Sequence, residues 1–341
     1  MKEGFFLYLV KRGFLAVFTL LVILLASYFL MRLAPGDPSK STMLGEGKEQ
    51  LAGDRSEFGQ SEVLKKKLHL DKPIAVGFFL WLKNVLKGDF GESVAVDKGR
   101  PVLSLILEHL PNTLKLNILA ILLTYTLAIP LGIFSAARPD SKADTALSIV
   151  LFFLFSLPVL WSGLMLQALF CKGGLYPVFP LKGLFEGAAP GMSSWEITGR
   201  TLMHFVLPVI CLSYGGFAAL ARFTRAGMLE VIREDYIRTA RSKGAGEARV
   251  ILHHAFRNAL ILMITLFAGI LPSLVGGSIL VEYIFNIPGM GSLSMLALSS
   301  RDLPLMMALF AMGGFLTLSG IFLADILYVL ADPRIDFRGR M

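Results

Sequence analysis

Six long stretches of the chain contain no aspartate, glutamate, lysine or arginine and are dominated by apolar side chains. They are residues 13–31, 116–137, 145–171, 201–221, 258–281 and 303–324. About 20 residues of α-helix, each rising about 1.5 Å, cross the roughly 30 Å hydrocarbon core of a bilayer. Every stretch meets this requirement, so the sequence predicts an all-α membrane protein with six transmembrane helices.

The composition agrees with a membrane location. Only 17% of the 341 residues are charged, whereas soluble domains carry about 25%. The net charge of +8 raises the question of nucleic acid, but the basic residues cluster between the apolar stretches and form no continuous basic surface. We therefore expect contact with a lipid bilayer and none with nucleic acid. Two cysteines, Cys171 and Cys211, are too few for a disulfide framework or a metal cluster.

The basic residues also predict the orientation of the chain. They gather before the first stretch, between the second and third, between the fourth and fifth, and after the sixth. Short cytoplasmic loops carry an excess of lysine and arginine, so both termini are predicted to be cytoplasmic. The first stretch is too long for a signal peptide and has no clean cleavage site after it, which predicts a retained helix.

This pattern divides the chain into four regions. They are a cytoplasmic N-terminus with the first transmembrane helix (1–33), an extracytoplasmic loop (34–110), a five-helix transmembrane core (111–331) and a cytoplasmic tail (332–341). Within the loop, 39–61 is polar and rich in glycine and is predicted to be irregular. An interfacial helix is predicted over 74–86, because Pro73 suits a helix start and Trp81 favours a membrane interface.

The most charged segment of the chain lies between the fourth and fifth stretches, within 223–257. Leu229, Ile232, Tyr236 and Ala240 recur at steps of three and four, which predicts that they share one face of a helix. Gly244 continues this row and can end the helix with a positive φ. Small side chains there would let another surface come close, so we expect this helix to contact a partner in the water phase.

Two motifs in this segment carry a resemblance to a known family. They are YIRTARSKG at 236–244 and HAFRNAL at 254–260. Both resemble the cytoplasmic "EAA" loop of permease subunits of binding-protein-dependent ABC importers, in particular those of the dipeptide, oligopeptide and nickel subfamily.

This resemblance implies a type I ABC-importer permease fold in a bacterial cytoplasmic (inner) membrane, with a cytoplasmic coupling helix between transmembrane helices four and five. It also implies two ATPase subunits, a second homologous permease subunit and an extracytoplasmic substrate-binding protein as partners. The expected ATPase-coupling residues lie within 234–258: Tyr236, Arg238, Thr239, Ala240, Lys243, Gly244, His254, Arg257 and Asn258.

The chain shows no motif for covalent chemistry. Its nearest approach to a phosphate-binding loop, at 45–49, lacks the glycine spacing and the hydroxyl residue after lysine. His253 and His254 are adjacent, so on a helix they point about 100° apart and form a poor metal pair. We therefore expect no enzyme activity, no metal and no cofactor in this chain, with ATP and magnesium bound by the partner ATPases.

Polar residues inside the apolar stretches are candidates for a transport pathway. Asn117 and Gln167 either line a pathway or bond to neighbouring helices, and both interpretations remain open. Glu282 follows the fifth stretch at its outer end, where a vestibule residue is expected. Prolines within four of the stretches predict kinks: Pro130, Pro158, Pro208 and Pro272.

The cargo is predicted from what the stretches lack. A metal-ion pathway would be expected to show several His, Cys or carboxylate ligands, whereas only His204 and Cys211 lie at mid-depth. Peptide uptake is therefore the leading prediction. A nickel-chelate importer is the alternative, and a secondary transporter is a further one, although it would require internal repeats and intramembrane ionisable residues.

Overall fold

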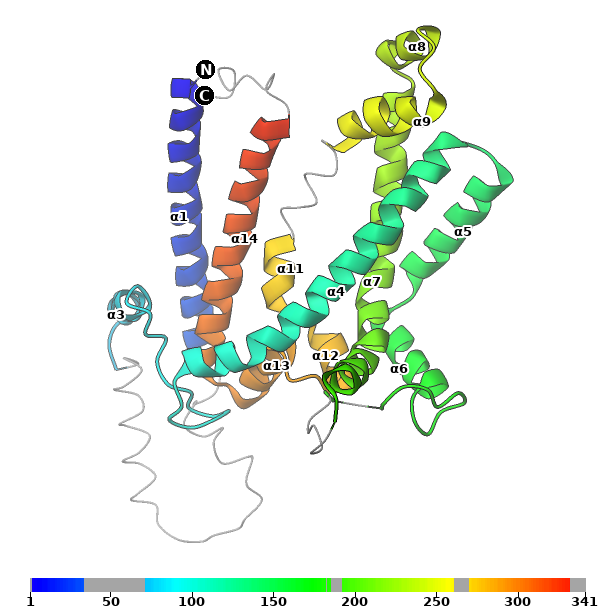
Figure 1. Ribbon diagram of the computed structural model, residues 1–341. Coiled ribbons are helices and arrows are strands. Elements are labelled where there is room, and N and C mark those ends of the chain that lie inside the picture. The colour runs from blue at the N-terminus through cyan, green and yellow to red at the C-terminus, as the bar shows by residue number, and fades with distance from the viewer. Residues whose placement is uncertain (1, 34–70, 182, 185–191, 261–269, 332–341) are drawn as a thin grey trace. The chain divides into compact units, whose positions relative to one another are not determined.

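The computed structural model describes residues 2–33, 71–181, 183–184, 192–260 and 270–331. These residues are mainly helical, and the described ranges contain two isolated β-bridges but no strand. The helices (Figure 1) are α1 (Lys2–Leu33), α3 (Ile74–Val85), α4 (Val102–Ala137), α5 (Lys142–Ser156), α6 (Val159–Phe170), α7 (Ser194–Ile232), α8 (Asp235–Ser242), α9 (Glu247–Arg249), the π-helix η2 (Val250–Ala255), α11 (Ile270–Gly276), α12 (Ile279–Phe285), α13 (Met290–Ser300) and α14 (Leu303–Ala331). The predicted irregular segment 39–61 and the tail 332–341 lie outside the described residues.

Four helices, α1, α4, α7 and α14, contain segments long and apolar enough to cross a membrane. Two bent pairs, α5 with α6 and 272–285 with α13, bring the count to six if each pair is one span. The predicted all-α membrane class is confirmed. The count of six stays a prediction, and part of the fifth stretch, 258–281, lies outside the described residues.

The third predicted stretch, 145–171, is not one helix. It breaks between α5 and α6 with a bend of 98°, where Leu157 is extended and Pro158 is the N-cap of α6. A residue before proline is driven out of the helical region, so Pro158 breaks the helix rather than kinking it. By contrast, α4 and α7 run continuously through Pro130 and Pro208.

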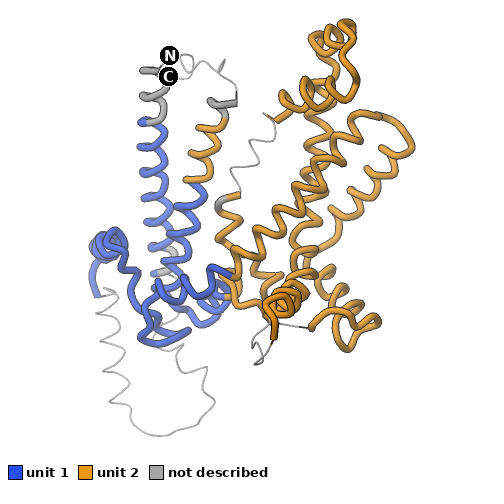
Figure 2. Tube along the Cα trace, in the orientation of Figure 1, with its two compact units in different colours: residues 1–111, 293–318 blue, residues 112–292, 319–341 orange. Residues whose placement is uncertain are grey.

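The chain divides into two compact units, Met1–Pro111 with Leu293–Leu318 and Asn112–Ser292 with Ser319–Met341 (Figure 2). In the first unit the helix predicted over 74–86 is confirmed as α3, with Pro73 as its N-cap. Its buried Phe78 contacts the ring of Tyr28 edge to face at 5.7 Å and packs against Ala311. The ring of Trp81 lies 6.3 Å from that of Tyr28, so this face of α3 is covered by α1 and α14.

A buried carboxylate in the first unit fixes the loop after α3 to the start of α14. Asp302 is fully buried, and its Oδ2 accepts hydrogen bonds from the Ser93 hydroxyl at 2.5 Å and from the N–H groups of 94–96 at 3.0–3.1 Å. Successive N–H groups arranged in this way form a nest for an anion. Its Oδ1 accepts from Leu305 N in the first turn of α14.

In the second unit, α4, α5 and α7 pack together closely. A cluster of buried residues from the three helices comprises Ala128, Leu151, Ala218, Leu220 and Ala221. Near it, a Cβ at Gly132 of α4 would lie 2.5 Å from the Cβ of Thr224 on α7. Only glycine therefore fits at this crossing of α4 and α7.

Replacing the buried carboxylate of Asp302 should destabilise the first unit. Asp302→Asn keeps the size of the side chain but turns an NH₂ group toward buried donors, each of which costs about 1–3 kcal/mol when left without an acceptor. We expect the free energy of unfolding to fall by about 2–4 kcal/mol, seen as a lower midpoint of thermal denaturation in detergent. The matched control is Asp97→Asn, because that half-exposed carboxylate pairs only with Arg100 at the surface, where such a pair contributes about 0–1 kcal/mol. Equal midpoints for the two variants would contradict the prediction.

Candidate functional site

The segment expected to couple the chain to a partner, residues 234–258, follows α7 in the second unit (Figure 1). It is called the coupling segment below. The prediction that Leu229, Ile232, Tyr236 and Ala240 share one helix face is wrong, because α7 ends at Ile232 and a new helix, α8, begins at Asp235. Glu234 between them has an extended backbone (φ −67°, ψ 148°). Two consecutive acidic residues suit a helix N-terminus, where the helix dipole favours negative charge, and this competes with a continuous helix.

Ile237 anchors α8 to the rest of the unit. Its side chain is fully buried in a cluster with Ala136 of α4, Met228 of α7 and Val250 of η2. Ala240, three residues later, is half-buried against the same cluster. The inward face of α8 is therefore Ile237 and Ala240, and sequence reasoning missed Ile237 because it carried the α7 periodicity across the break.

The opposite face of α8 is open. Of the predicted coupling residues, Tyr236, Arg238, Thr239, Lys243 and Gly244 are exposed. Gly244 has φ +82°, and a Cβ placed there would meet no atom within 4 Å. The prediction that Gly244 ends the helix is confirmed, since the N–H of Ala245 donates to Ala240 O at 3.2 Å across the turn. Whether a partner approaches Gly244 stays a prediction.

Residues 254–258, at the C-terminal end of the coupling segment, are hydrogen-bonded to α8. Asn258 donates from Nδ2 to the Tyr236 hydroxyl at 2.7 Å and to His254 O at 3.0 Å. The structure thus brings together three of the predicted residues, which are separated by up to 22 positions. Arg257 lies in the same stretch with an exposed side chain.

An ion pair closes the turn between α8 and α9. Arg241 donates to Glu247 through Nη2 at 2.6 Å and Nε at 3.1 Å, and this hydrogen bonding lowers the pKa of the Glu247 carboxyl below its ordinary value. Both side chains are well exposed, so solvent screening makes the pair weak. Sequence reasoning did not identify it.

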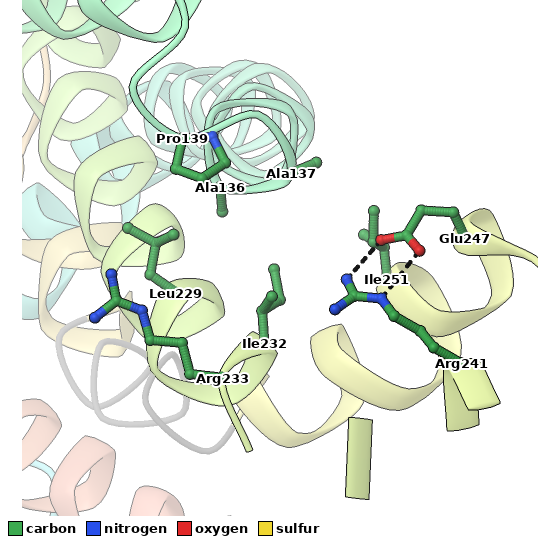
Figure 3. A pocket seen from close by; sticks show the side chains of 9 residues that line it. All are labelled: Ala136, Ala137, Pro139, Leu229, Ile232, Arg233, Arg241, Glu247 and Ile251. Carbon is green, nitrogen blue, oxygen red and sulfur yellow. Dashed lines mark hydrogen bonds and ion pairs between the residues drawn. The ribbon is translucent and has the colours of Figure 1, made fainter. Parts of the chain in front are cut away.

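A pocket of about 250 Å³ lies between the coupling segment and the ends of α4 and α7 (Figure 3). It is lined by Ala136, Ala137, Pro139, Leu229, Ile232, Arg233, Arg241, Glu247 and Ile251. Small-molecule sites usually measure about 300–1,000 Å³, so this hollow is small for a cargo site. It shows that side chains do not fill the space between the α4–α5 turn and the Arg241–Glu247 pair.

The two amides predicted as pathway residues both bond to backbone carbonyls. Asn117 donates from Nδ2 to Ser273 O at 2.6 Å and to Leu274 O at 3.1 Å. Gln167 donates to Ile284 O at 2.8 Å. These are the helix-to-helix bonds that the sequence left open as one of two interpretations, and a pathway role for either residue stays a prediction.

Glu282, the predicted vestibule residue, is fully buried. Its Oε1 accepts from the Thr113 hydroxyl at 3.0 Å and from Ser278 N at 3.3 Å, and its Oε2 accepts from Ser292 N at 2.9 Å. Around it, a Cβ would approach the carboxylate to 2.5 Å at Gly277, 2.6 Å at Gly289 and 3.0 Å at Gly291. The glycines make room for a carboxylate that holds the α11–α13 turns to α4.

Neither cysteine is paired: Cys171 and Cys211 are both free and buried. The described residues contain no group of three or more His, Cys, Asp or Glu side chains that could hold a metal ion. His253 and His254, on η2, have rings almost perpendicular at 85°.

Comparison with known proteins places this geometry in a family. Residues 128–337 match the model of the binding-protein-dependent transport system inner membrane component, and residues 5–117 match the model of the N-terminal region of such membrane components. The coupling segment and Glu282 fall within the first match, and Thr113, which donates to Glu282, falls within the second.

Relatives that match over nearly the full length of this chain indicate the same family. The chain is 38% identical to the oligopeptide transport system permease protein AppB of Bacillus subtilis (strain 168), over 97% of this chain and 99% of that protein. It is 32% identical to the inner membrane ABC transporter permease protein YejB of Escherichia coli O157:H7, over 98% and 99% of the two chains. It is 29% identical to the peptidoglycan transport system permease protein YejB of Agrobacterium fabrum (strain C58 / ATCC 33970), with the same coverage. This chain therefore belongs to the family of inner membrane components of binding-protein-dependent transport systems.

Proposed function

We propose that this chain is the permease subunit of an ATP-driven importer that takes up peptides. The observation that supports the proposal is the short helix α8, which is held by buried Ile237 and has an exposed opposite face. It lies in a segment whose sequence resembles the coupling loop of the family, within the part of the chain that matches the family model. Two ATPase subunits, which bind ATP and magnesium, would each grip one such segment. A second homologous permease subunit and an extracytoplasmic binding protein complete the assembly.

In this assembly the chain does mechanical work and no covalent chemistry. ATP binding to the partner ATPases favours one arrangement of the permease pair and hydrolysis favours the other. A ligand shifts a conformational equilibrium only by its differential affinity for the two states. The coupling segment must therefore transmit a displacement without deforming, and the Ile237 anchor and the Asn258–Tyr236 bond support this role.

Peptides are the proposed cargo because relatives in several bacteria are named as oligopeptide or peptide permeases. A nickel chelate remains the alternative, and it would travel as an organic complex. A secondary transporter is not favoured, because the buried carboxylates Glu282 and Asp302 are held by neutral donors within the chain.

The docking proposal predicts the effect of Gly244→Asp. A charged side chain in the open space above α8 should hold the ATPase away, so we expect loss of uptake and of ATPase co-purification with a normal amount of permease in the membrane. The control is Gly99→Asp, since Gly99 has the same φ of +82° and the same open surroundings, so it carries the same backbone strain outside the coupling segment. Normal uptake with Gly244→Asp, or equal loss of co-purifying ATPase in both variants, would refute docking at Gly244.

Ala240→Arg is also expected to abolish transport, but it is a poorer probe of docking. Ala240 packs against the chain's own buried cluster, so a bulky side chain there would disturb the seat of α8 as well as any contact with a partner. The amount of folded permease must therefore be measured beside uptake for this variant.

The proposed orientation, with six spans and both termini cytoplasmic, predicts the readout of reporter fusions. Fusions at Asp140, at Gly246 and in the tail should report the cytoplasm, because basic residues are close to each position in the sequence. They are Arg138 and Lys142, those of 222–257, and Arg334, Arg338 and Arg340. Fusions near Lys48 and Gly187 should report the outside. A cytoplasmic signal at Lys48 would show that the first helix does not cross the membrane.

The cargo proposal is tested in a strain that lacks this gene. Without the permease, uptake of labelled oligopeptides should fall to background and return when the gene is restored, while uptake of trace nickel is unchanged. Loss of nickel uptake with peptide uptake intact would reverse the choice of cargo and leave the coupling proposal standing.

A further inference from the structure

An ion pair between a buried aspartate and a partly exposed arginine joins α5 to α7 in the second unit. Arg225 of α7 donates to Asp144 of α5 through Nε at 2.9 Å and Nη2 at 2.7 Å, and Asp144 is only 3% exposed. The sequence placed Arg225 in a loop, but α7 extends beyond it to Ile232. The two residues are 81 positions apart, so no local sequence pattern predicts the pair.

The same carboxylate also holds the end of α4. It accepts a hydrogen bond from the Ser135 hydroxyl and another, at 3.1 Å, from the N–H of Asp140 in the α4–α5 turn. Asp140 has φ +61°, a conformation that is costly for most residues. One buried charge therefore gathers three pieces of chain: the last turn of α4, the turn after it and the body of α7.

This cluster lies close to the coupling helix along α7. Arg225 is seven residues before Ile232, where α7 ends, a rise of about 10 Å at about 1.5 Å per residue. After two intervening residues α8 begins, and its Ile237 packs against Met228 of α7 and Ala136 of α4. A displacement of α8 therefore acts directly on the ends of α7 and α4.

Apolar packing alone does not fix the α4–α5 turn to the coupling segment. The pocket of about 250 Å³ lies between Ala137 and Pro139 on one side and Arg241 and Glu247 on the other (Figure 3). Apolar contacts are not directional, whereas a two-point guanidinium–carboxylate pair fixes both distance and angle. The directional connection from α7 to the α4–α5 turn is thus the Asp144–Arg225 pair.

We propose that Asp144 and Arg225 are positioning residues for transport, whose ion pair makes α4, α5 and α7 move as one body when the coupling helix α8 is displaced. The proposal rests on the proposed function, because it assigns the path by which work done on α8 reaches the membrane helices. Without the pair, α7 and the end of α4 would follow α8 while α5 and the α4–α5 turn lag, so ATP would be hydrolysed with little transport.

The test uses the whole complex reconstituted in vesicles: this permease, its companion, the ATPases and the binding protein, with a labelled oligopeptide. Asp144→Asn removes the charge at nearly constant size, and Arg225→Lys keeps the charge but loses the two-point geometry. The matched control is Arg222→Gln, which removes an exposed cation one turn earlier on α7. The measured quantity is peptide transported per ATP hydrolysed, normalised to assembled complex.

We expect Asp144→Asn to co-purify with the ATPases as wild type does and to keep hydrolysing ATP. Its transport per ATP should fall by about tenfold or more, because the partly exposed Arg225 loses the two-point pair that fixes α7 to α5. Arg225→Lys should fall between this variant and wild type, and Arg222→Gln should match wild type. A pair that only stabilises the fold would lower the yield of complex and leave the ratio unchanged. An unchanged ratio in Asp144→Asn, or an equal fall in Arg222→Gln, overturns the proposal.

Two further outcomes are separable. If Asp144→Asn does not assemble, Arg225→Lys carries the same measurement, and a wild-type ratio there overturns the proposal. If the wild-type complex itself fails to bind ATPases or to move peptide, the proposed function fails, whatever the variants do.

Discussion

The constraint on which this structure depends is that a backbone in hydrocarbon must satisfy its own hydrogen bonds. Continuous helices do so without help, but a helix that breaks exposes carbonyl and N–H groups that need side-chain partners. The second unit supplies them at its breaks. Asn117 bonds the carbonyls of Ser273 and Leu274 near the end of α11, Gln167 bonds Ile284 O near the end of α12, and Glu282 accepts from the N–H groups of the turns on either side of α12.

Features that depend on neighbouring residues could be predicted from the sequence, and features that depend on contacts between distant residues could not. Apolar runs and charge located the membrane helices, and Pro73 located the start of α3, because these signals are local. The break at Pro158 was read as a kink because the residue alone does not fix the 98° bend between α5 and α6. The sequence predicts Glu282 as a vestibule residue but does not predict its cage, because the cage is assembled from positions between 113 and 292, which no local spacing connects.

The coupling segment shows the limit of periodicity arguments. Helical spacing relates the four residues Leu229, Ile232, Tyr236 and Ala240. Yet α7 ends at Ile232 and a separate helix begins at Asp235, so the two pairs lie on different helices. The eight residues of α8 are too few for a stable helix by themselves, so tertiary contact decides its register. That contact is Ile237 in the cluster shared by α4, α7 and η2. The exposed residues Arg238 and Thr239, predicted to couple to a partner, and the buried anchor Ile237 therefore lie on different faces of one short helix.

Three buried carboxylates are satisfied in two different ways, and the difference bears on motion. Asp302 and Glu282 accept hydrogen bonds from neutral N–H and hydroxyl groups, which come from 93–96 for Asp302 and from Thr113, Ser278 and Ser292 for Glu282, so each fixes a turn or loop to a helix. Asp144 alone of the three has a guanidinium partner, and that partner stands on the helix that leads to α8. A carboxylate held by neutral donors fixes a turn, whereas a charge pair between long helices couples their displacements, since separating it would leave the buried Asp144 carboxylate without its cation. Static turns at Glu282 and Asp302 and a load-transmitting pair at Asp144 together suit a chain that must move as a few stiff pieces.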